Sequence, residues 1–259
     1  KRDDFWEPSV FTQRSSELEV LLAKGYGNLS ETDRIQVHKY AVASNLPEVF
    51  ADAGQWMDSQ TFTLLQEMKE GGIEHAWIGL NSWEQAYGKP ELVETAVSQD
   101  YLIASYDSYH SIHEPGREQW ITAQFDDPAL YENAVITDQN GKPESGFQNV
   151  GRKLNPALSL PAVKNRMEGI MSSQLPFNSW FIDCDATGEI YDDYTPSHIT
   201  TQEEDLSARL ERMSYIRDQY HLVIGSEGGN DFAASDIAYA HGIELKTFAW
   251  MDEDMKKNQ

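Results

Sequence analysis

The sequence predicts an α/β fold of the (β/α)8 TIM-type barrel class, incomplete if only the visible strands are counted. Three observations predict it. Short apolar runs alternate with helical segments, nearly every residue within a run is apolar, and the chain has 259 residues. Alternating strands and helices form βα units around a parallel sheet, whose strands are buried on both faces. Such barrels often need about 250 residues, so we expect one domain over residues 1–259.

The first 60 residues are predicted to be mainly helical. Helices are expected over residues 17–23, 31–43 and 60–69. Ser30 and Asp33 have the pattern of an N-terminal cap for the second helix. Gly71 and Gly72 are typical of a helix end and predict where the third helix stops.

From residue 75 onward, strands and helices are expected to alternate. The predicted strands cover residues 75–80, 101–106, 179–184, 222–226 and 245–250. The predicted helices cover residues 90–98, 156–174, 203–219 and 231–240. The interval 119–154 interrupts this order, and Asp138-Gln139-Asn140-Gly141 within it predicts the turn of an inserted hairpin. Five strands are fewer than the eight of a closed barrel, so an incomplete barrel and an open doubly wound sheet are both left open.

The charge of the chain limits its partners. There are 43 acidic and 20 basic residues, which give a net charge of −23. This charge repels nucleic-acid phosphates and anionic membranes and suits a neutral substrate, although it can equally serve solubility alone. No apolar run in the sequence approaches the length of a membrane span. We expect no nucleic-acid partner and no membrane insertion, and the oligomeric state is left open.

Cysteine and histidine usage gives few further constraints. With the single cysteine Cys184 no intrachain disulfide is possible, so the redox compartment stays open. The chain begins with Lys1 without a signal-peptide pattern, and we expect its start to be a processing boundary, with a secreted or periplasmic bacterial location as one alternative. No metal and no cofactor is expected, because four histidines lack the spacing of metal ligands: His110, His113, His198 and His241.

Polar and aromatic residues gather where four predicted strands end, within residues 77–83, 103–110, 180–189 and 223–229. In parallel α/β folds the active site forms at this edge of the sheet. Aromatic rings stack on the C–H faces of sugars, while carboxylates and amides hold sugar hydroxyls. The composition therefore favours a neutral carbohydrate ligand. The residues expected to bind it are Trp77, Asn81, Tyr106, Asp107, Tyr109 and Asp185.

Two acidic residues, Asp183 and Glu227, end successive predicted strands. Cleavage of a glycoside needs one ionised carboxylate at the anomeric carbon and one protonated carboxyl group that gives its proton to the leaving oxygen. Because neighbouring parallel strands end at the same edge, we expect the two side chains to lie a few Å apart. Asp183 could instead cap the next helix, as could Asp185. A separation of about 5 Å would indicate retention, and about 6.5–9.5 Å inversion.

These motifs resemble those of glycoside hydrolase families 101 and 129, the α-N-acetylgalactosaminidase group. The resemblance covers roughly residues 75–245 and rests on four segments: 106–109, 181–183, 226–229 and 234–239. It implies a (β/α)8 barrel and retaining hydrolysis of an α-linked glycoside, an α-N-acetylgalactosaminide or α-galactoside. It further implies that Asp183 is the nucleophile and Glu227 the general acid/base. Asp185 and the acidic loop 189–201 depart from the family pattern, which leaves the sugar open.

Two other functions fit parts of the same pattern. Asp183-Cys184-Asp185-Ala186-Thr187 resembles the D-x-D-x-T signature of haloacid-dehalogenase-like phosphatases, in which Mg²⁺ offsets the phosphate charge. That signature usually opens its domain, whereas 182 residues precede it here. A carbohydrate-binding relative without catalytic activity is the third alternative, and it predicts binding without turnover.

Overall fold

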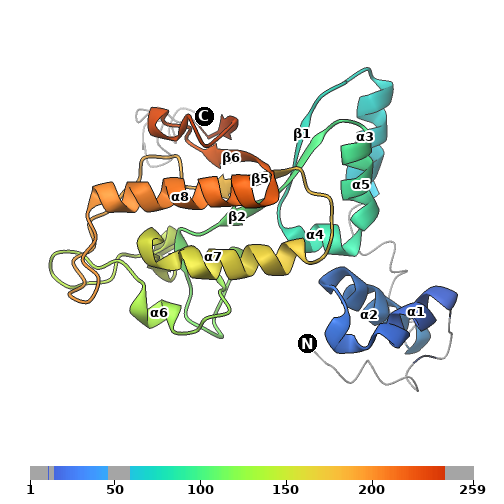
Figure 1. Cartoon of the computed structure of the whole chain (residues 1–259), viewed down its shortest axis with the longest axis horizontal. Coiled ribbons are helices and arrows are strands. Elements are labelled where there is room, and N and C mark those ends of the chain that lie inside the picture. Colours follow the sequence, from blue (N-terminus) through green and yellow to red (C-terminus); the bar gives the residue numbers. More distant parts are fainter. Residues whose placement is uncertain (1–10, 12–14, 46–58, 243–259) are drawn as a thin grey trace, which may run out of the picture. The chain divides into compact units, whose positions relative to one another are not determined.

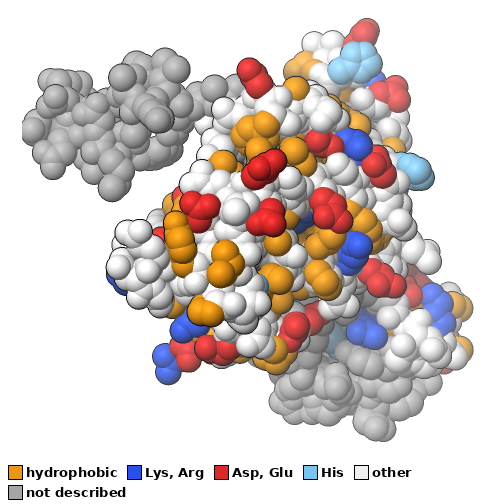
Figure 2. Space-filling model, turned by 60° about the vertical axis from the view of Figure 1, so that its left-hand side comes forward, with side chains coloured by type: hydrophobic (Ala, Val, Ile, Leu, Met, Phe, Trp, Pro, Cys, Tyr) orange, Lys and Arg blue, Asp and Glu red, His pale blue; other side chains and the backbone are white. Residues whose placement is uncertain are grey.

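The structure is a computed structural model, and it describes residues 11, 15–45 and 59–242 (Figure 1). It divides into two compact units. The first comprises Lys1–Ser105 and Met167–Asn178, and the second comprises Tyr106–Arg166 and Ser179–Gln259. On the face drawn in Figure 2, Asp and Glu side chains are spread among apolar and basic ones. Within the described ranges, none of the helices has both the length and the apolar character that crossing a bilayer requires.

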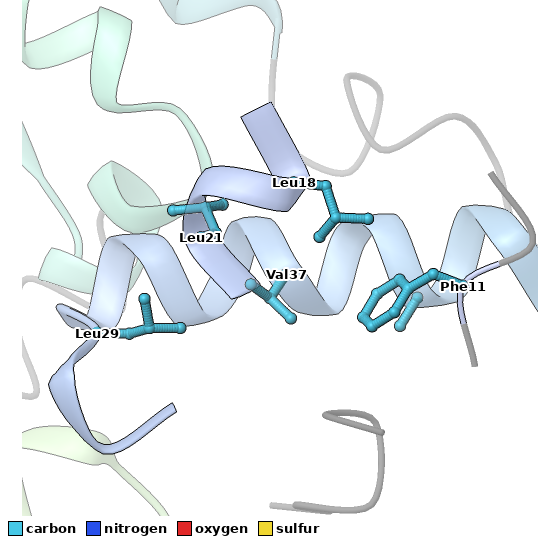
Figure 3. Close-up of a cluster of buried hydrophobic side chains, with 6 residues drawn as sticks. Phe11, Leu18, Leu21, Leu29 and Val37 are labelled. Carbon is cyan, nitrogen blue, oxygen red and sulfur yellow. The ribbon is translucent and has the colours of Figure 1, made fainter. Parts of the chain in front are cut away.

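Helices form the amino-terminal part of the first unit. They are α1 (Ser16–Lys24), α2 (Glu31–Asn45) and α3 (Ser59–Glu70), which confirms the three predicted helices. The hydroxyl of Ser30 accepts a hydrogen bond of 3.1 Å from the backbone N–H of Asp33, as the cap pattern predicted. Apolar side chains of this region pack into one buried cluster (Figure 3): Phe11, Leu18, Leu21, Leu29, Val37 and Ala41.

The first unit also holds a parallel strand pair. Strand β1 (Trp77–Leu80) pairs with the first part of β2 (Leu102–Ser108). In the chain, α4 (Trp83–Gly88) and α5 (Pro90–Ser98) follow β1 and precede β2. Of these two helices only α5 was predicted. Because α4 has only six residues, it shows too little of the helical period to be recognised from sequence.

Three parallel strands belong to the second unit. They are β5 (Ser179–Asp183), β6 (Val223–Glu227) and β7 (Tyr239–His241), neighbours in that order. Helix α8 (Gln202–Tyr220) connects β5 with β6 and begins at a capping box formed by Thr201 and Glu204. In this unit α8 lies beside the first part of α7 (Pro156–Met171), as Figure 1 shows. There Arg212 of α8 donates a hydrogen bond of 3.1 Å to Ser159 of α7.

One predicted element is wrong. The helix expected over residues 231–240 is instead a 3-10 turn at Asp231–Ala233 followed by strand β7. The pairing with β6 overrides the local pattern, and Gly225 of β6 makes it fit: a Cβ at that position would lie 2.0 Å from the ring of Tyr239. The strand predicted over residues 245–250 lies outside the described residues.

The interval 119–154 contains a 3-10 turn at Ile121–Ala123, the short helix α6 (Leu130–Asn133), a 3-10 turn at Phe147–Asn149, and β4 (Arg152–Lys153). Strand β4 pairs antiparallel with β3 (Ser111–Ile112). The predicted turn is present, because the N–H of Gly141 donates to the carbonyl of Asp138 over 2.9 Å. Only isolated antiparallel bridges flank this turn in the described chain, so the inserted hairpin is not confirmed.

The predicted α/β class is confirmed. Parallel pairs join β1 to β2 and β5 to β6 to β7. Helices α4 and α5 follow β1 and α8 follows β5, whereas a 3-10 turn leads from β6 to β7. This arrangement agrees with a partial (β/α) barrel. The described residues hold fewer parallel strands than the eight of a closed barrel.

Candidate active site

Two acidic side chains of the second unit meet at the ends of neighbouring strands. Asp183 is the last residue of β5, and Glu227 is the last residue of β6. Ile182 lies opposite Ser226 in the parallel register, so the two acidic residues that follow share one face of the strands. A carboxylate oxygen of Asp183 and one of Glu227 lie within 4.8 Å of each other. The structure thus brings together the predicted pair.

A buried hydroxyl and a glycine hold these two strand ends together. The hydroxyl of Ser226 donates to the carbonyl of Ile182 over 2.6 Å and accepts from the N–H of Ala186 over 3.1 Å. Gly228 follows Glu227 with a φ of +86°, and a Cβ there would lie 2.6 Å from the Cα of Thr187. Only glycine fits this close approach without displacing backbone.

Tyr106 of β2 orients Asp183. Its hydroxyl donates a hydrogen bond of 2.7 Å to Oδ2 of Asp183, and its ring stacks on Phe181 with centroids 6.1 Å apart. Burial, and then the negative charge of Asp183, hold the pKa of Tyr106 far above its usual range. The hydroxyl therefore keeps its proton and acts as a donor to the carboxylate.

The thiol of Cys184 lies between the two carboxylates. Its Sγ is 3.5 Å from Oδ2 of Asp183 and 3.6 Å from Oε2 of Glu227. Burial, and then the charges of these two residues, raise the pKa of Cys184 far above its usual range, so the thiol stays protonated. Its φ of +64° is unusual for a residue with a side chain. Cys184 was not among the predicted site residues, although its place directly after a predicted strand was a signal.

Cys184 also bears on metal binding. Two groups of side chains among the described residues bring three potential ligand atoms within 4.8 Å of one another, and Cys184 belongs to both. One group adds Asp183 and Glu227, and the other adds His110 and Glu189. Metals bind the thiolate rather than the thiol, so a metal in either group would have to displace the proton of Cys184.

Strand β7 completes the site on the side of Glu227. Glu227 lies opposite His241 in the register of β6 and β7. The ring of His241 stacks on Phe181, with centroids 4.2 Å apart and planes 4° from parallel. The backbone of Gly242 approaches Glu227 closely, because a Cβ there would lie 3.1 Å from Cγ of Glu227. An aromatic stack of Tyr106, Phe181 and His241 thus lies beside the carboxylates.

Asp107 faces the opposite way from Tyr106, because successive side chains of a strand point to opposite faces. It is fully buried, and its Oδ1 accepts a hydrogen bond of 2.8 Å from Arg166 of α7. Burial raises its pKa, although Arg166 opposes this shift. Tyr109 is fully buried too, with the guanidinium of Arg166 5.4 Å from its ring centroid. The expected contacts of Asp107 and Tyr109 with a sugar are therefore not supported by their placement.

Asp185 is fully buried as well and forms a bidentate ion pair with Arg212 of α8. Its Oδ2 lies 2.8 Å from Nε of Arg212, and Arg209 approaches its Oδ1 to 3.7 Å. This pair attaches the turn after β5 to α8 and leaves Asp185 no exposed atom for a sugar hydroxyl. It also argues against the phosphatase signature, whose second aspartate must reach the substrate.

The remaining two predicted residues belong to the first unit. Asn81 follows β1 and is exposed, and its backbone N–H donates to Oε1 of Gln85 over 3.0 Å. Trp77 is the first residue of β1, at its amino end, and is 37% exposed. Its ring extends along the strand, because a Cβ at Gly79 would lie 2.6 Å from it. For both residues, contact with a substrate stays a prediction.

A charged cluster that was not predicted from the sequence includes Glu189, in the segment after β5. Oε1 of Glu189 lies 2.7 Å from Nζ of Lys153, and its Oε2 lies 3.1 Å from Nε2 of His110. The hydroxyl of Tyr191 also donates to Oε1 of Glu189. The cluster borders the carboxylate pair, because single ligand atoms of His110, Cys184 and Glu189 lie within 4.8 Å of one another. The sequence placed Glu189 only at the start of an acidic loop.

Comparisons with known proteins agree with this geometry. Residues 67–259 match the family described as glycosyl hydrolases related to GH101 family, GH129. No curated protein matches the chain in sequence. The fold is similar to that of α-N-acetylgalactosaminidase NagBb from Bifidobacterium bifidum. With its GalNAc complex the TM-score is 0.60 and the identity 17%, over 74% of this chain and 32% of that chain.

A quadruple mutant of the same protein gives a TM-score of 0.59 and 18% identity, over 75% of this chain and 34% of that chain. At these identities the likeness shows a shared fold, and the chain spans about a third of the length of NagBb. The family match covers well over half of the chain and includes both Asp183 and Glu227. The chain therefore belongs to the glycosyl hydrolases related to the GH101 family, GH129.

Proposed function

We propose that this chain carries the catalytic centre of a retaining glycoside hydrolase that cleaves an α-linked glycoside. The observation that carries the proposal is the distance of at most 4.8 Å between oxygens of Asp183 and Glu227. Retaining enzymes hold their two carboxyl groups about 5–5.5 Å apart, whereas inverting enzymes need about 6.5–9.5 Å to admit a water molecule. The family and the likeness to an α-N-acetylgalactosaminidase support an α-N-acetylgalactosaminide or α-galactoside as substrate.

In the first step, Asp183 attacks the anomeric carbon while Glu227 donates its proton to the leaving oxygen. The bond between the sugar and the leaving group breaks, and an ester between the sugar and Asp183 forms. Tyr106 and Cys184 both contact Oδ2 of Asp183, so we assign the attack to Oδ1. The exposed ring of His241, which stacks on the buried Phe181, offers a flat surface beside the carboxylates for the C–H face of the sugar.

In the second step, Glu227 removes a proton from water, and the water oxygen attacks the anomeric carbon. The bond to Asp183 breaks, the carboxylate is regenerated, and the sugar leaves with its original anomeric configuration. The net charge of −23 suits a neutral sugar, which is not repelled by an acidic protein.

The test is a screen of α- and β-linked aryl glycosides, with proton NMR to identify the anomer released first. We expect α-glycoside cleavage with the α anomer as first product, and loss of at least about a thousandfold in turnover for Asp183→Asn. Circular dichroism shows whether the variant is folded. Near-normal turnover of a folded Asp183→Asn protein would refute the assignment. Binding without turnover would favour a non-catalytic relative, and Mg²⁺-dependent release of phosphate from an aryl phosphate would favour the phosphatase alternative.

A further inference from the structure

We propose that Glu189 contacts the substrate, accepting a hydrogen bond from a hydroxyl or amide N–H of the sugar bound at Asp183 and Glu227. This inference rests on the proposed function and deepens it. A carboxylate oxygen of Glu189 lies within 4.8 Å of the thiol of Cys184. That thiol is 3.5 Å from Asp183 and 3.6 Å from Glu227. Glu189 is therefore separated from the reacting pair by one small side chain.

Basic side chains surround Glu189. Nζ of Lys153 lies 2.7 Å from Oε1 of Glu189 and 2.6 Å from Nε2 of His110. Nε2 of His110 in turn lies 3.1 Å from Oε2 of Glu189, and Nη1 of Arg209 lies 3.3 Å from Nδ1 of the same ring. Burial lowers the pKa of His110, although Glu189 opposes this shift.

The carboxylate of Glu189 has room for one more donor. A carboxylate oxygen accepts about two hydrogen bonds. Oε1 already accepts from Lys153 at 2.7 Å and from Tyr191. Oε2 faces Nε2 of His110 at 3.1 Å, and a single neighbour at this oxygen leaves an acceptor position open. We assign this position to the sugar.

The uneven burial of the cluster argues for a ligand. The side chains of Lys153 and His110 are 13% and 7% exposed, whereas that of Glu189 is 46% exposed. An ordinary surface ion pair is exposed on both sides and contributes little to stability. Here two nearly buried basic side chains adjoin a carboxylate whose own surface stays open to solvent. This is the arrangement of a preorganised acceptor, which needs no reordering when a ligand arrives.

The charge of Glu189 restricts what can bind there. The hydrogen bond from His110, and further contacts with Lys153 and Tyr191, hold the pKa of Glu189 far below its usual range despite its partial burial. The carboxylate is therefore anionic throughout the neutral and mildly acidic range. It accepts from neutral hydroxyl or amide donors and repels a sulfated or carboxylated sugar at this position.

The test combines Glu189→Gln with aryl glycosides that lack one hydroxyl or the acetamido N–H at a time. For the wild type, removal of the contacted group should lower kcat/KM roughly tenfold or more. For Glu189→Gln, the intact substrate should already show that loss, mainly in KM, and removal of the same group should cost nothing further. A purely structural role would instead lower the rates of all the substrates by one common factor. Additive losses for every analogue would overturn the inference.

Glu114→Gln is the matched control, because Glu114 is 50% exposed and forms one ion pair, with Arg117 at 3.1 Å. It should leave kcat and KM unchanged. Glu189→Asp is the second variant if Glu189→Gln does not fold, since it keeps the charge for Lys153 and shortens the side chain. In Glu189→Asp too, kcat/KM should no longer differ between the intact substrate and the analogue that lacks the contacted group. If a folded Glu189→Asp protein shows the same difference in kcat/KM as the wild type, this would count against the contact.

Calorimetry with N-acetylgalactosamine gives a readout without turnover. We expect the Kd to rise roughly tenfold in Glu189→Gln relative to the wild type. An unchanged Kd, with wild-type hydrolysis intact, overturns the role of Glu189 and leaves the proposed function standing. A wild-type protein that neither cleaves the aryl glycosides nor binds this sugar overturns the proposed function, and the role of Glu189 falls with it.

Discussion

The hydroxyl of Tyr106 donates a hydrogen bond of 2.7 Å to Oδ2 of Asp183, across 77 positions of the chain. A side chain of β2 therefore orients the proposed nucleophile at the end of β5. The ring of Tyr106 is itself held by stacking on Phe181. Because the carboxylate is fixed through Oδ2, Oδ1 is held in one orientation, which is what the proposed nucleophilic attack requires.

Removal of this hydroxyl should slow the chemical step. Tyr106→Phe is expected to lower kcat about tenfold to a hundredfold, because a hydrogen bond to a charged group contributes about 1.5–3 kcal/mol. The measurement is the steady-state rate with an activated aryl glycoside. Tyr194→Phe is the control, since Tyr194 is 49% exposed, and its rate should equal that of the wild type. An equal kcat for Tyr106→Phe would show that the bond does not orient the nucleophile.

The thiol of Cys184 should react slowly with iodoacetamide at pH 8. Burial and the charges of Asp183 and Glu227 raise its pKa, so little of the reactive thiolate is present. The alkylation rate, followed by mass spectrometry, should be lower than in urea-unfolded protein. In Asp183→Asn one of the two negative charges is removed, and the rate should increase. An unchanged rate in that variant would mean that burial alone protects the thiol.

Substitution of Gly228 should destabilise the fold more than substitution of a comparable glycine. Gly228 and Gly116 have similar φ values, +86° and +82°, so alanine costs similar backbone strain at both positions. An added Cβ at Gly228 meets the Cα of Thr187 at 2.6 Å, whereas nothing lies within 4 Å of a Cβ at Gly116. Gly228→Ala should therefore lose about 1–3 kcal/mol more in urea unfolding than Gly116→Ala. Equal losses would show that the Thr187 backbone yields easily.

The buried pair of Asp185 and Arg212 should show strong coupling in a double-mutant cycle. Arg212→Met leaves the carboxylate of Asp185 buried beside fewer partners and should cost about 3–5 kcal/mol of unfolding free energy. The double variant Asp185→Leu with Arg212→Met should cost less than the sum of the single changes, because it removes both charges. Chemical denaturation of the four proteins measures this. Additive costs would contradict the coupling.

The ends of β5 and β6 were predictable because each apolar run is followed by an acidic residue. Asp183 and Glu227 were predicted as the catalytic pair for that reason, and both lie at the last positions of their strands. The sequence indicated that the two carboxyl groups are near each other but not their separation, since this depends on the register that places Ile182 opposite Ser226. A shift of one residue in that register would turn one of the two carboxylates to the other face of the strands.

The predicted substrate-binding residues show what composition alone does not contain. Tyr106 and Asp107 are adjacent in the chain, and both seemed suited to a sugar. In the strand they face opposite sides, so Tyr106 reaches Asp183 and Asp107 reaches Arg166. Asp185 turns inward to Arg212 in the same way. The ion-pair partners, Arg166 of α7 and Arg212 of α8, lie far from these acids in the chain, so no local sequence pattern indicated the pairing.

By itself the sequence determined the α/β class, most of the helices and strands, and the two acidic residues at adjacent strand ends, because these follow from local periodicity and from polar residues that end apolar runs. Only the tertiary structure decided which acids meet at the ends of β5 and β6 and which are buried in ion pairs. It also decided that residues 239–241 form strand β7 rather than helix. The physical reason is that burial and pairing depend on neighbours distant in the chain, which local patterns do not contain.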